Sequence, residues 1–263
     1  MNETLPAPVG ASRSKWDLVT RVLGTIDLHY HFRTRPLRRF FAKHERNRSV
    51  RIFEFGCGNG GNLLELRARR SSMIGVGMDI DHDFIHAAQI SAKAKGFDGL
   101  SFVCTDSIDE IKDKPASFDY VMLIDVLEHL DDPSASLHEA ARMLKPGGSV
   151  LISVPTRRYP RIFGREYHEA VGHVRDGFNL QELDDLFGPS FERVQYNYNT
   201  GLIASAACAC FYRFVPNIRS RKLAIFSMIS LHLSRLVDVL NGESRSCSLW
   251  AVYRQVPMGA SSA

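Results

Sequence analysis

The sequence predicts an α/β fold in which a largely parallel sheet is covered by helices on both faces. Short apolar runs of strand type alternate along the chain with segments of helical periodicity, and a glycine-rich turn directly follows the first apolar run. The predicted strands are apolar through most of their length, which is typical of parallel strands buried on both faces. The 263 residues suffice for one large domain with a full core.

The elements are expected in a regular order. Strands are predicted at residues 50–55, 72–80, 100–106, 118–125, 149–155, 191–198 and 248–254. Helices are predicted at residues 61–70, 82–95 and 134–144, with a further helix from Asn179 whose Glu182 completes a capping pattern. Asp81 and Asp83 are expected to cap the second of these helices, and Gly96 to end it. Leu144-Lys-Pro-Gly-Gly148 is interpreted as the stop and turn after the third.

Composition and charge are those of an ordinary globular protein. Hydrophobic residues make up 44% of the chain and charged residues 24%, with a net charge of +4. The 5 cysteines are odd in number and form no C-x-x-C pair, so we expect reduced, apolar side chains in a cytoplasmic protein. The first residues lack the basic start and apolar core of a signal peptide, and no apolar run reaches the roughly 18–20 residues of a spanning helix.

The segment before the first strand is basic. Residues 1–14 and 258–263 are expected to be disordered tails, with an N-terminal basic helical segment at 15–48 and the main domain at 49–257. Residues 33–51 carry eight Arg or Lys and one Glu, interleaved with apolar side chains. This pattern suits a surface for nucleic acid, anionic lipid or a phosphorylated substrate, and equally a solvated helix face.

The glycine-rich turn indicates a nucleotide-like ligand. Glycines at 56, 58 and 60 give G-x-G-x-G, whereas dinucleotide sites have G-x-G-x-x-G. Glu54 precedes the turn, where its charge would repel a pyrophosphate and attract an ammonium group. The turn therefore favours S-adenosylmethionine, whose methionine end is zwitterionic and whose sulfur is cationic.

Further acidic residues are expected at the ends of the next strands. Asp79 falls nineteen residues after Gly60, where an acid can hold the two ribose hydroxyls of an adenosine. Asp106, with Ser107 beside it, is placed to accept from the adenine amine, and Asp125 ends the fourth strand. Because ligands of parallel sheets bind beyond the carboxyl ends of the strands, we expect these acids to surround one site.

Residues 50–155 resemble the class I S-adenosylmethionine-dependent methyltransferases, in the subgroup that acts on small molecules and on lipid or glycan acceptors. The matching segments are Glu54-Phe-Gly-Cys-Gly-Asn-Gly60, Gly75-Val-Gly-Met-Asp79, Cys104-Thr-Asp106, Phe118 to Leu130 and Leu144 to Gly148. The resemblance implies a Rossmann-like sheet of seven strands with an antiparallel last strand. It also implies S-adenosyl-L-methionine as cofactor, bound by Glu54, Phe55, Gly56, Cys57, Gly58, Gly60, Asp79, Ile80, Asp106, Ser107 and Ile124.

The segment Asp125-Val-Leu-Glu-His129 also resembles ubiquinone-type O-methyltransferases, in which acids and a His at this place are associated with a divalent metal. Asp125 stands where that pattern usually has Glu, and the string Val-Leu-Glu-His-Leu occurs in members with no metal role. We therefore expect no metal.

The resemblance also places a Gly-His-x-Arg segment near the acceptor, here Gly172 to Arg175. His129 and His173 are candidate catalytic residues, because a His with a pKa near ~6.5 can act as a general base at neutral pH. The candidates on the acceptor side are Tyr167, His168 and Arg175. For each His, a structural hydrogen bond is the competing interpretation.

An insertion separates the last two predicted strands, which form a tight hairpin in the parent fold. Residues 200–246 are interpreted as two helices joined by basic residues. Exposed apolar helices are unstable in water, so we expect this insertion to pack as a lid over the acceptor pocket, against a second subunit, or on a membrane surface. The lid is the interpretation we favour.

Together these features predict an S-adenosylmethionine-dependent methyltransferase that O-methylates a small molecule or a lipid- or sugar-linked acceptor. We expect the protein in the cytoplasm. Two further features are left open: peripheral contact with the inner face of the membrane through residues 200–246 and 33–51, and a homodimer. An RNA methyltransferase that uses residues 33–51 is the first alternative, opposed by the lack of an RNA-binding module and of an Asn-Pro-Pro-Tyr-like motif. A dehydrogenase is opposed by G-x-G-x-G with Glu54. A non-catalytic donor-binding subunit that activates a partner is the third alternative.

Overall fold

The computed structural model describes residues 28–44, 49–201, 203–206 and 242–256. The strands are β1 (Arg51–Phe55), β2 (Ile74–Asp79), β3 (Leu100–Cys104), β4 (Phe118–Ile124), β5 (Leu144–Pro155), β6 (Phe191–Asn199) and β7 (Ser248–Gln255). The α-helices are α2 (Leu28–His44), α3 (Gly61–Arg69), α4 (His82–Ala94), α5 (Pro133–Ala141), α6 (Tyr159–Phe163), α7 (Arg165–Ala170) and α8 (Leu180–Phe187). Short 3-10 turns are η1 (Ile108–Glu110), η2 (Leu127–His129) and η3 (Gly188–Ser190).

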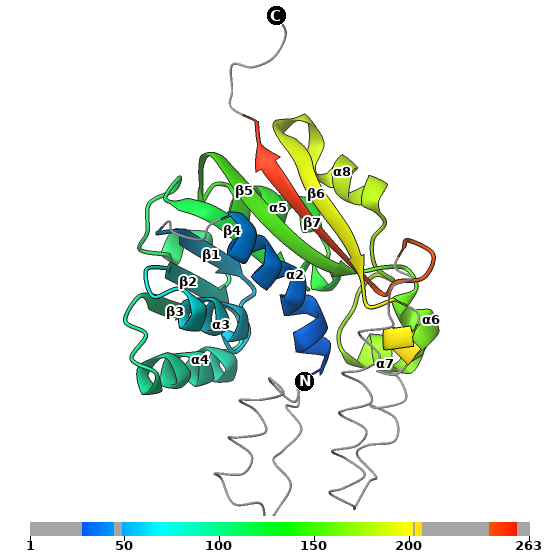
Figure 1. The fold of residues 1–263 in the computed structure, drawn as a ribbon, viewed down its shortest axis with the longest axis horizontal. Helices are drawn as coiled ribbons and strands as arrows, with labels where there is room; N and C mark the ends of the chain where they lie inside the picture. Colours follow the sequence, from blue (N-terminus) through cyan, green and yellow to red (C-terminus); the bar gives the residue numbers. More distant parts are fainter. Residues whose placement is uncertain (1–27, 45–48, 202, 207–241, 257–263) are drawn as a thin grey trace, which may run out of the picture.

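The strands form one sheet in the order β3-β2-β1-β4-β5-β7-β6 (Figure 1). β1 to β5 pair in parallel, and β7 runs antiparallel between β5 and β6. The predicted Rossmann-like fold with seven strands and an antiparallel last strand is confirmed.

Alternating side chains of the strands build a core on each face of the sheet. In β1, Phe53 packs with α5 and α8 on one face, and its neighbour Ile52 packs with α2, α3 and α4 on the other. This alternation follows from the period of two residues in a strand. The sheet is therefore covered on both faces, as the apolar strands predicted.

Helix α2 belongs to the core of the sheet. Leu37 and Phe41 are each 1% exposed, and the ring of Phe40 lies 5.6 Å from Tyr120 and 5.8 Å from Trp250. Within the N-terminal segment that was expected to be helical, residues 28–44 form this helix, and the apolar side chains in its second half are buried. The described part of the segment that the sequence set apart from the domain at residue 49 thus packs on the same sheet.

Two helix ends follow the predicted capping chemistry. The Asp81 carboxylate accepts from Asp83 N and Phe84 N and begins α4, and Asn179 with Glu182 forms a reciprocal capping box at α8. Asp83 was wrongly expected to cap as well. Asp83 is exposed and lies inside the first turn of α4. The cap is Asp81, which accepts from the free N–H groups of this turn.

The helix predicted at 134–144 is shorter than expected, and the following turn is part of a strand. α5 ends at Ala141, and Leu144 already pairs with Phe118 of β4. The backbone N–H of Phe118 donates to Met143 O at 3.0 Å, so pairing with β4 begins before Lys145-Pro-Gly-Gly148. Tertiary pairing has overridden the local turn signal, and the register shifts between Phe118 and Tyr120 absorb the extra residues.

The cysteines are only partly the buried apolar side chains that we expected. Cys57 and Cys247 are buried, whereas Cys104 is exposed. Cys104 lies at the end of β3, the edge strand of the sheet, where one side has no neighbouring strand to cover it. Cys208 and Cys210 lie outside the described residues.

The two ends of the insertion are held together at the end of β5. Thr156 Oγ1 donates to Ser246 O at 2.6 Å, and Thr156 N donates to Cys247 O at 2.8 Å. Cys247 N donates in turn to Thr200 O at 3.0 Å, and Ser205 Oγ donates to the same carbonyl at 2.7 Å. All five residues are buried, and we call them the hairpin clamp: Thr156, Thr200, Ser205, Ser246 and Cys247. It joins the carboxyl end of β5 to the point where the chain leaves β6 and returns to β7.

Several expectations fall outside the described residues. These are the tails at 1–14 and 258–263, residues 15–27 and 45–48 of the N-terminal segment, and most of the insertion at 200–246. Within the insertion, residues 203–206 are described and are helical. Within the described part of the chain, no helix has the length and apolar character needed to cross a membrane.

The hairpin clamp makes a stability prediction. Thr156→Val keeps the shape of the side chain but removes the hydroxyl that donates to the buried Ser246 carbonyl. A buried acceptor without its donor costs about 1–3 kcal/mol, so we expect the free energy of unfolding in urea to fall by this amount. Thr156→Ser retains the hydroxyl and should stay within about 1 kcal/mol of wild type. Equal losses in both variants would contradict the assignment.

Candidate active site

The acidic residues predicted at the strand ends lie along one edge of the sheet. β3, β2, β1 and β4 are neighbours, and they are parallel, so their carboxyl ends meet at the same edge. Glu54 is the second-last residue of β1, and Asp79 is the last residue of β2. Asp106 lies two residues after the end of β3, and Asp125 directly follows β4. The four acids thus border one region.

The glycine turn between β1 and α3 is tied to the tip of β2. Gly58 N donates to Asp79 Oδ2 at 2.7 Å, and Cys57 N donates to Met78 O at 2.8 Å. Gly58 has a φ of +51°, and a Cβ there would meet no atom within 4 Å. Gly60 has a φ of +73°, and a Cβ there would lie 2.6 Å from the ring of Phe102. Left-handed backbone and close packing explain why glycine occupies these two places, and the open side of Gly58 lets a ligand approach the backbone.

Glu54 is a buried acid next to this turn. It is 0% exposed; its Oε1 accepts from Asn62 Nδ2 at 2.6 Å, and its Oε2 has no hydrogen-bond partner among the described residues. Burial raises the pKa of Glu54 to about 8, an effect that the Asn62 hydrogen bond lowers and the charge of Asp79 raises. A buried carboxyl group with a free oxygen and no cation is the environment that an ammonium group fits, so these residues suit the methionine end of S-adenosylmethionine.

The other predicted donor residues surround the same edge with different exposure. Asp79 is half-buried, and its Oδ1 also accepts from Asp81 N at 3.0 Å. Ile80 is 76% exposed, so its apolar side chain lies open beyond β2. Asp106 is exposed, and the Ser107 hydroxyl accepts from Asp109 N as the cap of η1. Phe55 and Ile124 are half-buried at the ends of β1 and β4, next to each other in the sheet order.

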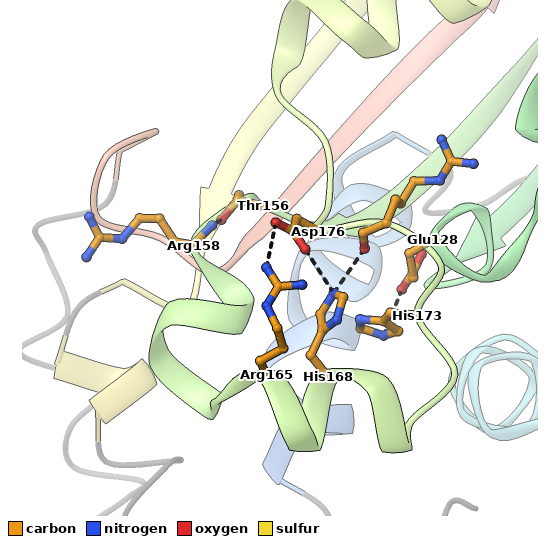
Figure 2. A network of polar contacts seen from close by, with 8 residues as sticks. Glu128, Thr156, Arg158, Arg165, His168, His173 and Asp176 are labelled. Carbon is orange, nitrogen blue, oxygen red and sulfur yellow. Dashed lines mark hydrogen bonds and ion pairs between the residues drawn. The ribbon is translucent and has the colours of Figure 1, made fainter.

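Histidines from three separate elements meet beyond β4. The ring centroid of His173 lies 4.8 Å from that of His129 and 4.7 Å from that of His168. Tyr159 of α6 joins them, with its ring 5.2 Å from His173. His173 Nε2 lies 4.0 Å from Glu128 Oε1, and that carboxyl group is 1% exposed (Figure 2). We call these five residues the histidine cluster.

The histidine cluster is assembled by a loop that folds back over η2. His129 Nδ1 lies 3.0 Å from Gly172 O, and Val174 N donates to Glu128 O at 2.9 Å. These contacts join residues more than forty positions apart in the sequence. One potential ligand atom from each of Glu128, His129 and His173 lies within 4.8 Å of the others, which is close enough for a metal ion to bind all three. The expectation that no metal takes part stays a prediction.

The three acceptor-side candidates differ in their surroundings. His168 is buried, and its Nε2 lies 3.0 Å from Arg175 O and 4.0 Å from Asp176 Oδ1 (Figure 2). The other carboxylate oxygen of Asp176, Oδ2, pairs with Arg165 at 3.2 Å. The guanidinium of Arg175 donates to Leu130 O at 2.6 Å and so ties the loop to η2. Tyr167 is 38% exposed. These contacts give His168 and Arg175 a structural task, and their role toward an acceptor stays a prediction.

Sequence reasoning missed three residues of this region. Asn62, which bonds Glu54, sits inside the helix after the glycine turn and matches no part of the motif quoted above. Glu128 belongs to a quoted motif, but its approach to His173 depends on the fold-back of the loop. Tyr159 follows β5 and carries no local signal for its place beside the histidines.

Comparison with known proteins supports a family. The sequence profile of a family described as "Methyltransferase domain" matches residues 28–190. The ubiquinone biosynthesis O-methyltransferase of Neisseria meningitidis serogroup C is 32% identical over 119 residues, which cover 45% of this chain and 50% of that protein. The protein of the same name from Saccharophagus degradans is 26% identical over 167 residues, or 62% of this chain and 67% of that protein. The match thus spans half the length (50%) of the first of these relatives.

Solved structures share the fold at low identity. Coclaurine N-methyltransferase bound to N-methylheliamine and SAH has a TM-score of 0.58 at 10% identity, covering 84% of this chain and 72% of its own. The plantazolicin methyltransferase BpumL in complex with SAH has a TM-score of 0.57 at 13% identity, with 93% and 91% covered. The [4+2]-cyclase SpnF has a TM-score of 0.59 at 17% identity, with 84% and 81% covered. Because a cyclase is among them, the fold alone does not define the reaction.

The burial of Glu54 predicts how stability depends on pH. The pKa of Glu54 is about 8 in the folded protein against 4.5 for an ordinary Glu, so the folded state holds this proton more tightly than the unfolded state. Between these two values the unfolded state ionises first, and wild type should lose up to about 1.4 kcal/mol of stability from this group per pH unit. Glu54→Gln cannot ionise, so its stability relative to wild type should increase from pH 4.5 to pH 8.

Thermal and urea unfolding of the ligand-free protein at a series of pH values measures this difference. Glu110→Gln, which changes an exposed acid on η1, serves as the matched control and should track wild type across the series. A constant difference between Glu54→Gln and wild type at every pH would show that the carboxyl group of Glu54 titrates normally.

Proposed function

Because the chain belongs to the class I S-adenosylmethionine-dependent methyltransferases, we propose that it transfers a methyl group from this donor to a hydroxyl oxygen of a small molecule, or of a lipid- or sugar-linked acceptor. The observation that carries the proposal is the placement of two unlike groups at one edge of the sheet. The buried acid of β1 suits a cationic donor, and the histidine cluster beyond the adjacent β4 suits an acceptor that must lose a proton.

On the donor side, Glu54 and the backbone of the glycine turn would hold the ammonium end, and Asp79 would hold the ribose. Each Asp79 oxygen accepts one backbone N–H and keeps a lone pair for a hydroxyl. The exposed Ile80 would cover one face of the adenine, and Asp106 would accept from its amine. When bound, S-adenosylmethionine supplies a sulfonium methyl group that an aligned nucleophile can attack in line.

On the acceptor side, His173 is the general base that we propose, with His129 beside it. The buried Glu128 lies 4.0 Å from His173 Nε2 and would stabilise the imidazolium that forms when the ring takes a proton. The closely packed ring of Tyr159 keeps water from one side of His173. Oxygen is favoured over nitrogen as the acceptor atom because a hydroxyl group needs such a base, and because the two sequence relatives named above are ubiquinone biosynthesis O-methyltransferases.

A second candidate for activating the hydroxyl is a divalent metal held by Glu128, His129 and His173. The observation that favours it is the spacing of their ligand atoms, all within 4.8 Å. One carboxylate and two imidazoles form a donor set that binds several first-row divalent metals. When bound, such an ion lowers the pKa of a coordinated hydroxyl group.

The proposed base predicts a specific loss of activity. Methyl transfer is measured with donor labelled in the methyl group and with mass spectrometry of the product. The acceptor panel contains phenolic and lipid- or sugar-linked hydroxyl compounds and, for comparison, amines. His173→Asn should lower turnover by about 10²–10⁴-fold, the range that a general base contributes, with little change in donor affinity. His138→Asn, which alters an exposed His on α5, is the control and should retain wild-type turnover. Labelling of amine acceptors alone would contradict the O-methyltransferase proposal.

Removal of divalent metal separates the two ways of activating the hydroxyl. If His173 acts as a base without metal, the chelator-treated and dialysed protein should keep its turnover. If turnover is lost and returns on adding a divalent ion, and if His129→Ala prevents that return, the metal candidate is supported. This comparison uses the same acceptor and the same labelled donor throughout.

The proposal also fixes where the remaining alternatives stand. A cytoplasmic location, peripheral membrane contact and a homodimer remain proposals. RNA methylation through the basic α2 segment would require RNA affinity that falls steeply with salt. A non-catalytic donor-binding subunit would bind the donor and label none of the acceptors.

A further inference from the structure

Asn62 stands next to the buried acid of the donor site. It is the second residue of α3, and its amide nitrogen donates to Glu54 Oε1 at 2.6 Å. The second oxygen of the Glu54 carboxyl group, Oε2, and the amide oxygen of Asn62, Oδ1, are both buried and have no hydrogen-bond partner among the described residues. The structure thus joins two polar side chains and leaves one acceptor on each of them unused.

When Glu54 is ionised, both of these oxygens are acceptors, and a donor from outside the protein would satisfy them. A buried polar atom without a hydrogen-bond partner destabilises the folded protein, and native proteins contain few of them. Negative charge dominates here, because Asp79 raises the pKa of Glu54, and Glu54 with Asp79 adds to the effect of burial in raising the pKa of the Cys57 thiol. A ligand group with several N–H donors and a positive charge satisfies these conditions.

We propose that Asn62 is a specificity-determining residue of the donor site, which fixes one oxygen of Glu54 through its amide nitrogen and receives the ammonium group of the donor through its amide oxygen. This inference rests on the proposed function, since it takes S-adenosylmethionine as the ligand. It adds a side chain to the donor site and gives the site a means of selecting ligands that carry the amino acid end.

The backbone around Asn62 holds it in place for this task. Leu64 N donates to Gly60 O at 2.9 Å and starts α3, while the close packing of Gly60 on Phe102 fixes the direction of the helix. An amide is the side chain that meets both needs at this place. Aspartate has no N–H for Glu54 and would add a second negative charge, and leucine has the same size but neither donates nor accepts.

The Asn62 amide also couples donor binding to a proton. Its hydrogen bond lowers the pKa of Glu54 against the larger effect of burial, which leaves that pKa at about 8. An ammonium group binds the ionised carboxylate, so donor affinity should weaken as the pH falls below about 8. Loss of the Asn62 amide would raise the pKa of Glu54 further. The pH above which donor affinity becomes constant would then move upward.

The test is calorimetric titration of the intact protein with two ligands. S-adenosylhomocysteine carries the ammonium and carboxylate groups, and 5′-methylthioadenosine has the same nucleoside without them. At pH 7 we expect Asn62→Leu to weaken S-adenosylhomocysteine by more than about tenfold, as for a lost hydrogen bond to a charged group, and 5′-methylthioadenosine by less than about twofold. Asn197→Leu on β6, which replaces an exposed Asn, is the control and should bind both ligands as wild type does.

The pH profile and a second variant separate this role from a structural one. In Asn62→Leu, the pH at which S-adenosylhomocysteine affinity becomes constant should lie above that of wild type. If that variant fails to bind 5′-methylthioadenosine, Asn62→Asp, which keeps the size but loses the N–H, should show the same upward movement. An equal weakening of both ligands with an unchanged profile, or unchanged affinity for S-adenosylhomocysteine, would overturn the inference. Wild-type protein that binds neither ligand would overturn the donor assignment itself.

Discussion

The burial of one carboxyl group at the end of β1 constrains the whole donor edge. Glu54 is fully buried, with no cation near it among the described residues. Its negative charge therefore needs a partner, and the backbone beside it must leave room for one. The glycine turn leaves this room, since a Cβ at Gly58 would meet no atom within 4 Å. It bends back over β2 because Cys57 can lie where Gly77 has no side chain; a Cβ at Gly77 would come within 2.7 Å of Cys57 Sγ. The charge would be balanced by the ammonium group of the donor, as proposed above.

Sequence patterns predicted the parts of the protein that depend on local chemistry. The strand ends at Glu54 and Asp79, the cap at Asp81 and the capping box at Asn179 follow from short-range rules and are confirmed in position. The extended start of β5 was missed, because Leu144 pairs with Phe118 across a gap of twenty-six residues and so overrides a clear turn signal. No single-sequence pattern encodes such pairings.

The acceptor side shows the same limit more strongly. Its histidines come from η2, α7 and the loop after it, and each looks like an ordinary surface or capping residue in its own segment. They meet because Arg175 donates to a carbonyl of the loop that follows η2, while His168 contacts the backbone of Arg175 in return. The resemblance singled out these histidines as candidates, and their roles stay predictions; their mutual distances depend on this long-range tie. The roles of the individual side chains are therefore less determined by sequence than the donor edge is.

The place of β7 in the sheet has a consequence for how the protein is made. β7 is the last strand along the described part of the chain, yet it lies between β5 and β6, and β7 is the only described strand that pairs with β6. During synthesis, β5 must therefore wait with an open edge, and β6 without a partner, until residues 248–255 have left the ribosome. The parallel half of the sheet has no such delay. Nascent chains that stall within the preceding insertion should be the ones that chaperones and proteases must handle, since they expose a long apolar edge of β5.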